Sequence, residues 1–315
     1  MNETDQVDQL LPAPPPILGI EPGVDRVHYV ISDTHGGHVL GLMLPGVTLY
    51  QEQFNSKTLE TEVVEWEPEP NPLQAMLNSW YVEDLEFVEK LAAGRPITGH
   101  HNGDPTQGTK YPREWVSTRE ADQVLIAENN LRQGYLLSNM EAYYLTMGTG
   151  SHEMGEGSST ILIARMLQQR FPEIKTRISN HWLMSINDVE FDIAHHGPGP
   201  GSRKWLDANN LRWYVNDIMQ RDVDRDRVPP AVVVRSHFHT IAMATSHYRK
   251  KTTFYTTQGV LTPGYTGLDF FARQATRSKN EVTVGIVVFE ISAKGKVNIE
   301  TNFRILDTRT REIIK

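Results

Sequence analysis

Apolar residues along the chain gather in short runs, and most of these runs end in polar or glycine-containing loops. Residues 27–31 form the first run, which leads directly into the loop Ser32-Asp33-Thr34-His35-Gly36-Gly37. Runs of four to eight apolar residues closed by turn residues are typical of buried strands. The same pattern predicts further strands over residues 142–147, 189–194 and 231–234, and one more strand ahead of the turn at Asn187-Asp188.

Apolar residues at helical spacing predict helices between these strands. Asn71 is a good N-cap, Pro72 suits the first helical position, and Gly94 follows the last turn. One face of that helix holds Tyr81, Leu85, Val88 and Ala92. Similar patterns predict helices over about 118–133, 158–170 and 203–219. Because strands alternate with helices, the sequence indicates an α/β fold.

The chain is expected to hold one folded domain behind an extended arm. Residues 1–25 contain a Pro-rich stretch at 11–16, which disfavours helix and favours extended backbone. Residues 26–315 then form a single domain, since α/β and two-sheet folds often use about 250 residues in one unit. Within that domain, the acidic, Pro-containing segment 41–70 is an excursion, and residues 281–305 are a C-terminal β-hairpin around Lys294-Gly295.

Composition narrows the classes of function. The 315 residues carry 31 Lys and Arg against 39 Asp and Glu, a formal net charge of −8. This balance disfavours a surface that coats nucleic acid, although a local site stays open. The clearest basic cluster, Arg249-Lys250-Lys251, is typical of a solvated turn. Because the chain has no cysteine, disulfides, thiolate-zinc sites and cysteine nucleophiles are excluded. Any metal must be held by nitrogen and oxygen ligands.

We expect no membrane-spanning segment. The longest apolar run, residues 39–50, is broken by glycine and proline and is shorter than the ~20 residues that a spanning helix needs. The acidic N-terminus lacks the positive charge and apolar stretch of a secretory signal. The expected location is therefore the cytoplasm.

Candidate chemistry appears where the predicted strands end. Open α/β sheets bind ligands at the carboxyl ends of their strands. Among the 12 histidines, six lie at such ends together with two aspartates: His35, His152, His195, His196, His237, His239, Asp33 and Asp104. Each loop alone also fits an ordinary turn or a satisfied histidine pair, but five such loops in this order are hard to assemble by chance. His237 and His239 are the most ligand-like pair, because residues i and i+2 of extended backbone point to the same side.

In their order, these loops resemble the signature of the calcineurin-like metallophosphoesterases. The family pattern is D-x-H, G-D, G-N-H-[DE], a lone H before G, and G-H-x-H. The corresponding residues of this chain are Asp33-Thr34-His35, Gly103-Asp104, Gly150-Ser151-His152-Glu153, His196-Gly197 and Ser236-His237-Phe238-His239. The resemblance covers roughly residues 26–240. Three features are similar to those of members found in bacteriophages and prophages: the helix ahead of Asn102-Gly103-Asp104, the Gly148-Thr149-x-x-His152 loop and the Arg235-Ser236-His237-x-His239 ending. A phage origin would make the cytoplasm that of a bacterial host.

The resemblance implies a fold and a cofactor. The implied fold is α/β, a two-sheet β-sandwich flanked by helices, with two divalent metal ions at the strand ends. Manganese is expected ahead of iron or zinc, and all three suit mixed imidazole and carboxylate ligands better than calcium does. The first ion would be held by Asp33, His35, Asp104 and His239. The second would be held by Asp104 as a bridge, His196, His237 and a neutral oxygen, with the choice between His195 and His196 left open.

The implied activity is phosphoester hydrolysis, with a phosphodiester, a nucleotide or nucleic acid as the expected substrate. A hydroxide bridging two metal ions attacks the phosphorus in line, and both ions polarise its oxygens. His152 would stabilise or protonate the leaving oxygen. The alternatives are a phosphomonoesterase and a metal-binding but inactive scaffold or virion-associated protein. A pure scaffold has no need of His152, so its presence favours catalysis.

Three departures from the family pattern concern the site. Ser151 replaces the usual asparagine ligand, so Ser151 or Thr149 is the candidate oxygen of the second site. Gln107 stands where many relatives have an aspartate that orients the catalytic histidine, and Glu153 is the alternative carboxylate for that role. Gly108 takes the place of an arginine of the protein Ser/Thr phosphatases, which disfavours a phosphoprotein substrate. The individual substrate and the oligomeric state stay open.

Overall fold

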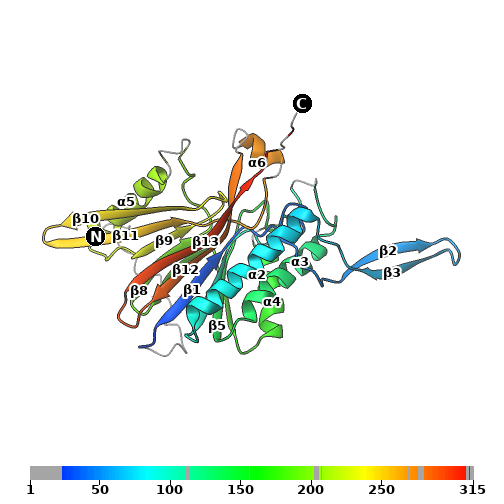
Figure 1. The fold of residues 1–315 in the computed structure, drawn as a ribbon, viewed down its shortest axis with the longest axis horizontal. Coiled ribbons are helices and arrows are strands. Elements are labelled where there is room, and N and C mark those ends of the chain that lie inside the picture. Colours follow the sequence, from blue (N-terminus) through cyan, green and yellow to red (C-terminus); the bar gives the residue numbers. More distant parts are fainter. Residues whose placement is uncertain are drawn as a thin grey trace, which may run out of the picture.

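The computed structural model describes residues 23–110, 114–155, 157–201, 206, 208–268, 270–275, 280–309 and 312. In this part of the chain, two β-sheets pack face to face and helices cover their outer faces (Figure 1). The expected α/β two-sheet sandwich with flanking helices is therefore confirmed. Most of the expected arm, residues 1–22, lies outside the described residues.

The first sheet has six strands in the order β13-β12-β1-β4-β5-β6. Its parallel part consists of β1 (Arg26–Ile31), β4 (Ile97–Asn102), β5 (Met140–Thr146) and β6 (Lys175–Ser179). On the other side of β1, the antiparallel pair β12 (Glu281–Ile291) and β13 (Val297–Asp307) completes the sheet. This pair is the C-terminal hairpin predicted around Lys294-Gly295.

The second sheet has five strands in the order β10-β11-β9-β8-β7. Their bounds are Ala242–Lys250 for β10, Thr253–Leu261 for β11, Val232–Arg235 for β9, Val189–Ala194 for β8 and His181–Ile186 for β7. The three central strands are parallel, and each outer strand pairs antiparallel with its neighbour. As predicted, β7 and β8 are joined at Asn187-Asp188.

Three helices cover the first sheet: α2 (Pro72–Ala92), α3 (Glu120–Tyr135) and α4 (Ser158–Arg170). The start of α2 follows from its sequence, because the Asn71 side chain accepts from the Gln74 backbone N–H at 3.0 Å and the Gln74 side chain accepts from the Asn71 backbone N–H at 3.1 Å. The short helix α6 (Phe270–Ala275) lies between β11 and β12 in the chain. None of the helices in the described ranges combines the length and apolar composition that a membrane span requires.

Helix α5 (Asn209–Asp224) covers the second sheet. The sequence predicted this helix over 203–219, and in the described residues both bounds are later. Ala208 has a left-handed backbone with φ 66°, so the regular helix begins only after it. The buried residues Leu211, Val215, Met219 and Val223 recur every four positions, which carries the helix one turn further than expected.

The core between the two sheets is formed by alternate residues of the facing strands. On β8, Val189, Phe191 and Ile193 point inward, where they meet residues of β12 such as Phe289. This alternation buries one face of each strand, and burial of apolar surface is the main stabilising contribution to such a sandwich.

Residues 49–66, expected only as part of an excursion, form a two-stranded ribbon. Strands β2 (Leu49–Asn55) and β3 (Glu60–Trp66) pair antiparallel and project from the body of the molecule (Figure 1). Leu49 and Trp66 anchor the base of the ribbon by packing near Met43, Val47 and Ile126.

Candidate metal centre

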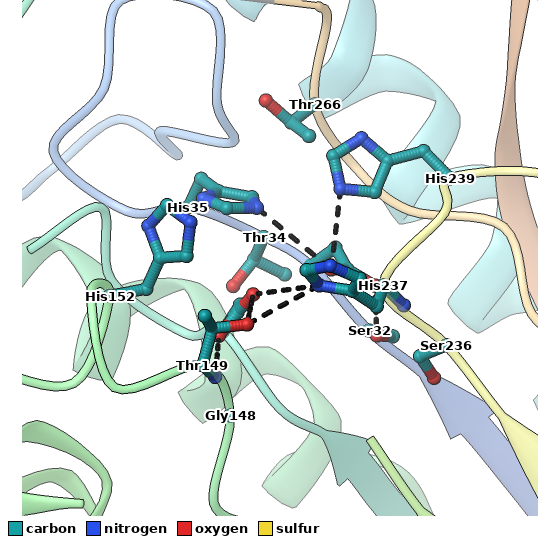
Figure 2. A network of polar contacts seen from close by, with 12 residues as sticks. Ser32, Thr34, His35, Gly148, Thr149, His152, Ser236, His237, His239 and Thr266 are labelled. Atoms are coloured by element: carbon teal, nitrogen blue, oxygen red, sulfur yellow. Dashed lines mark hydrogen bonds and ion pairs between the residues drawn. The ribbon is translucent and has the colours of Figure 1, made fainter. Parts of the chain in front are cut away.

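The five predicted loops meet at one edge of the sandwich. Figure 2 shows residues of the loops that follow β1, β5 and β9. Each of the five loops follows the carboxyl end of a strand, namely β1, β4 and β5 in the first sheet and β8 and β9 in the second. The residues that these loops bring together are Asp33, His35, Asp104, Thr149, His152, His195, His196, His237 and His239. The topology thus collects residues that are up to about 200 positions apart in sequence, as expected for a ligand site at strand ends.

Left-handed backbone at five of these residues turns the loops sharply. The φ angles are 52° at Asp33, 44° at His35, 55° at Asp104, 75° at His237 and 47° at His239. This region costs a non-glycine residue about 1–3 kcal/mol, and Asp and His are among the residues that adopt it most readily. Such strain gathered in one set of loops is typical of a functional site.

The first group of candidate ligands consists of Asp33, His35 and His239. Nε2 of His239 lies 3.3 Å from Oδ1 of Asp33, and Nε2 of His35 lies 3.9 Å from the same oxygen. Both Asp33 Oδ1 and His35 Nε2 are buried and make no hydrogen bond. Buried polar atoms are nearly always hydrogen-bonded, so these two atoms call for a further partner such as a cation.

The second group forms around Asp104. Its Oδ2 lies 3.0 Å from Nε2 of His195 and 3.9 Å from Nδ1 of His237. The imidazole of His196 completes a cluster with these two histidines. Asp104 also belongs to a cluster with His35 and His152, so its carboxylate stands between the two groups.

The Thr149 hydroxyl lies at the centre of the second group. It donates to Asp104 Oδ2 at 3.1 Å, and it is 3.3 Å from the nearest nitrogens of His196 and His237 and 3.4 Å from Nε2 of His195. Ligands about 2.1 Å from a tetrahedral or octahedral ion are roughly 3.0–3.4 Å apart from one another, so these separations suit a shared ion. Within the described ranges, none of these contacts involves the Ser151 hydroxyl. Of the two candidate oxygen ligands, only the Thr149 hydroxyl lies among the ligand atoms of the second group in the described residues.

The loop that carries Thr149 approaches Asp104 closely, and this approach requires glycine at position 148. A Cβ atom there would lie 2.1 Å from Asp104 Oδ1 and 2.3 Å from the Asp104 backbone nitrogen. With glycine, the Thr149 backbone N–H donates to Asp104 Oδ1 at 2.6 Å. Thr149 therefore donates a hydrogen bond to each oxygen of the Asp104 carboxylate, one from its backbone N–H and one from its hydroxyl.

His195 lies deeper than the predicted ligand His196. Its side chain is 1% exposed, Nδ1 donates to the Asn102 carbonyl at 2.6 Å, and Nε2 points at Asp104. A backbone carbonyl on one ring nitrogen is the usual support of a metal-binding histidine. Every second residue along β8 points inward, and this alternation continues to position 195. The same alternation in the sequence could have identified His195 as the inward-facing histidine.

Gln107 contacts two histidines of the site. Its side-chain oxygen accepts from Nδ1 of His35 at 2.9 Å, and its backbone carbonyl accepts from Nδ1 of His152 at 2.6 Å. The rings of His35 and His152 are perpendicular, with centroids 4.6 Å apart. Both imidazoles therefore present Nε2 to the centre of the site. Many relatives have a carboxylate at this position. Here it is the side-chain amide of Gln107, whose oxygen accepts from His35.

Glu153 has a different role from the orienting carboxylate that was expected as an alternative. Its buried carboxylate accepts hydrogen bonds from the backbone of Gly148 and Thr160 and from the hydroxyls of Ser159 and Thr160, at 2.6–3.1 Å. These bonds join the start of α4 to the Gly148-Thr149 loop. The Glu153 carboxylate therefore accepts from the α4 start and from Gly148. His152 is instead oriented by the backbone carbonyl of Gln107.

Burial and mutual charge fix the protonation of the site. Burial alone raises the pKa of Asp104, but the imidazoles of His195 and His237 hold it well below its ordinary value. Burial lowers the pKa of His195, while the carboxylates of Asp104 and Asp33 outweigh burial and raise it to about 9. Burial, and next the neighbouring His152, keep the pKa of His35 well below its ordinary value. Charged carboxylates and a neutral His35 are the states that bind a cation, and binding at His195 displaces a proton.

Together, these residues fit divalent cations. Among the described residues there are four overlapping groups, and within each group the ligand atoms lie within 4.8 Å of one another; Asp33, His35 and Asp104 each belong to two of the groups. Imidazole nitrogen with carboxylate and hydroxyl oxygen is a donor set that suits manganese, iron or zinc. Asp33 Oδ1 and His35 Nε2, which are buried without a hydrogen bond, belong to this set.

Comparisons with known proteins add little to this geometry. No family model matches the chain, and no curated protein does. Among solved structures, a protein of unknown function, AQ665 from Aquifex aeolicus, is similar over 68% of this chain and 80% of its own length, with 11% identity and a TM-score of 0.29. Vps29 of Chaetomium thermophilum is similar over 89% and 98%, with 10% identity and a TM-score of 0.28. At such scores, the site must be interpreted from its own residues.

Proposed function

We propose that this chain is a dinuclear metal-dependent phosphoester hydrolase of the calcineurin-like type. The observation that carries the proposal is the meeting of Asp33, Asp104 and Thr149 with six histidines at one edge of the sandwich. The first cation would be held by Asp33, His35 and His239. The second would be held by His195, His237 and Thr149, with His196 beside them and Asp104 shared by both.

Two bound divalent cations would supply an activated water at neutral pH and would neutralise the oxygens of the phosphoryl group. The protein places Asp104 between the two sites and supports each ligand from behind, as Gln107 does for His35 and the Asn102 carbonyl does for His195. His152 keeps its Nδ1 proton on the Gln107 carbonyl, so Nε2 is left to carry a proton to the leaving oxygen. His196 and the partly exposed His237 mark the side from which substrate enters.

We propose a phosphodiester rather than a phosphomonoester as the substrate class. In the described part of the chain, the ion pairs of Asp33 and Asp104 are all with histidines. A monoester dianion carries one more charge than a diester, and arginine or lysine is the usual group that neutralises it. The donor set of this site therefore favours the less charged ester.

A phosphoprotein substrate is disfavoured by the backbone at Gly108. Its φ of 74° is left-handed, and a Cβ there would lie 2.2 Å from the Ser151 carbonyl oxygen. The arginine that the protein Ser/Thr phosphatases carry at the matching place would not fit this loop.

Hydrolysis assays on chelated and metal-loaded protein test the proposal. We expect bis-p-nitrophenyl phosphate to be cleaved with added Mn²⁺ and not after chelation, and to be cleaved faster than p-nitrophenyl phosphate. Cyclic nucleotides and single-stranded DNA extend the same panel. Loaded protein that binds metal but cleaves none of these esters would contradict the hydrolase and support the scaffold alternative.

A further inference from the structure

One face of the β2–β3 ribbon exposes three large apolar side chains to solvent. Its register places Tyr50 opposite Glu65, Glu52 opposite Val63 and Phe54 opposite Thr61, and opposite residues share a face. We call these six residues the arm face. On it, Tyr50 is 44% exposed, Phe54 62% and Val63 66%. A two-stranded ribbon is marginally stable by itself in water, so an apolar stripe of this kind gains much from a covering partner.

A second exposed face lies on the hairpin β10–β11. Here Arg249 is opposite Phe254 and His247 is opposite Thr256, and the imidazole of His247 stacks on the ring of Phe254 at a centroid distance of 5.4 Å. Helix α5 packs on the other side of this hairpin, against residues such as Ala244. The uncovered side, which we call the tip face, consists of Met243, Thr245, His247, Arg249, Phe254 and Thr256, with Met243 45% and Phe254 63% exposed.

The two hairpins carry opposite charge. Residues 49–66 contain four glutamates and one lysine, whereas residues 242–261 contain three basic residues and no acidic residue. Glu52 and Glu65 lie on the arm face, and Arg249 lies on the tip face. Lys250 pairs with Asp226 at 2.9 Å beside the tip face. Because complementary charge steers association and orients partners, each face suits the other better than it suits itself.

The hairpins stand at opposite ends of the longest axis of the molecule (Figure 1). The arm face therefore cannot reach the tip face of the same chain, but it can reach that of another. We propose that the arm face of one molecule packs on the tip face of a second copy of this chain. Two ribbons packed in this way bury Tyr50, Phe54 and Val63 against Met243 and Phe254. Such a head-to-tail contact is heterologous and leads to a ring or an open chain of molecules.

The proposed contact is small and carries charge, so the association should be weak and sensitive to salt. Six residues on each face cover less than the roughly 800 Å² per partner of a standard interface. Association should therefore depend on protein concentration, and it should weaken with added salt because the charges are at the surface.

Sedimentation of the full chain over a range of concentrations tests this inference. We expect wild type to self-associate, and we expect Phe54→Asp and Phe254→Asp each to raise the dissociation constant by about 30-fold or more. Leu136→Asp is the matched control, because Leu136 is 61% exposed at the end of α3 and lies on neither face. Circular dichroism of each variant checks that the fold is kept.

Mixing the two variants distinguishes a head-to-tail contact from any other. The intact arm face of Phe254→Asp can bind the intact tip face of Phe54→Asp, so an equimolar mixture should form a 1:1 dimer that grows no further. A mixture that stays monomeric would overturn the proposal, and so would monomeric wild type at every concentration. Association of Phe254→Asp alone at wild-type strength would show that arms pair with arms, which also contradicts it. None of these outcomes depends on the metal centre.

Discussion

The side-chain oxygen of Gln107 lies 2.9 Å from Nδ1 of His35, and this contact decides which nitrogen of His35 faces Asp33. An amide oxygen only accepts, so Nδ1 carries the proton and Nε2 keeps a lone pair. That lone pair points toward Asp33 Oδ1, 3.9 Å away, and both atoms lack a hydrogen bond. An amide here therefore prepares His35 as a ligand.

We predict that Gln107→Met weakens one metal site. Loss of a supporting hydrogen bond typically costs about 10–100-fold in metal affinity, and the loss should fall on the cation held by Asp33, His35 and His239. Gln107→Glu keeps an acceptor for His35 and should recover most of the affinity. Calorimetric titration of Mn²⁺ into apo-protein measures both variants. Wild-type affinities in Gln107→Met would remove Gln107 from the support of the site.

A second prediction concerns Thr149. A neutral hydroxyl is a weaker ligand than the usual amide oxygen, so wild type should bind two cations with unequal affinity. Thr149→Val removes the hydroxyl while nearly keeping the shape, and it should abolish the weaker binding step, whereas Thr149→Ser should retain it. Ser151→Ala is the control and should bind as wild type does. Loss of a cation in Ser151→Ala with Thr149→Val silent would give the ligand role to Ser151.

A third prediction separates binding from catalysis at His152. His152→Ala should keep both cations while turnover of an activated diester falls by about 10²–10⁴-fold, the range of general acid catalysis. His181→Ala, which removes an exposed histidine of β7 outside the candidate site, is the comparison for loss of an imidazole elsewhere. Turnover of His152→Ala close to that of wild type would give His152 a structural role and raise the scaffold alternative.

The fourth prediction concerns stability and pH. His28 is fully buried between the sheets near Phe191 and Phe289, its Nδ1 lies 2.8 Å from the Thr98 hydroxyl, and burial lowers its pKa from 6.5 to about 3. Because the folded pKa is depressed, the stability that neutral His28 contributes is present above pH 6.5 and is lost as the pH falls from 6.5 toward 3. The slope approaches about 1.4 kcal/mol per pH unit for this one group.

Urea unfolding in metal-free buffer between pH 7.5 and 4.5 checks this expectation. His28→Asn retains a polar group near Thr98 but cannot titrate, so its free energy of unfolding should fall less steeply with acid than that of wild type. Thr98→Val is the control, since it removes the hydrogen-bond partner and leaves the imidazole in place. Parallel curves for wild type and His28→Asn would mean that His28 does not titrate differently on folding.

Much of the fold was predictable because local signals agree with the final packing. The Asn71-Pro72 start of α2, the limits of α4 and the turn at Asn187-Asp188 were all identified from residue type and spacing. Strand β4 was not predicted as an element, because its sequence Ile-Thr-Gly-His-His-Asn is polar although every residue in it is buried. Only packing between two sheets makes such a strand necessary. The pairing of β10 with β11 and the ribbon β2–β3 were missed for a related reason, since most residues of β2, β3 and β10 are polar.

The candidate site was predictable as a set of loops but not in its finer contacts. The order of the motifs identified Asp33, His35, Asp104, His237 and His239, which the fold brings together. The contacts of Thr149 and Gln107 depend on how far one loop reaches over another, for example where Gly148 lets its loop approach Asp104. Such distances between segments far apart in sequence are set by tertiary packing, and local spacing does not encode them.

The number of divalent cations bound to each chain tests the central claim most directly. Native mass spectrometry of Mn²⁺-loaded protein should show two ions per wild-type chain. Asp104→Asn, which weakens the carboxylate shared by both groups, should lose at least one ion and abolish diester hydrolysis. Wild-type protein that carries no bound ion, or that hydrolyses diesters equally well after thorough chelation, would contradict a dinuclear metal centre at these strand ends.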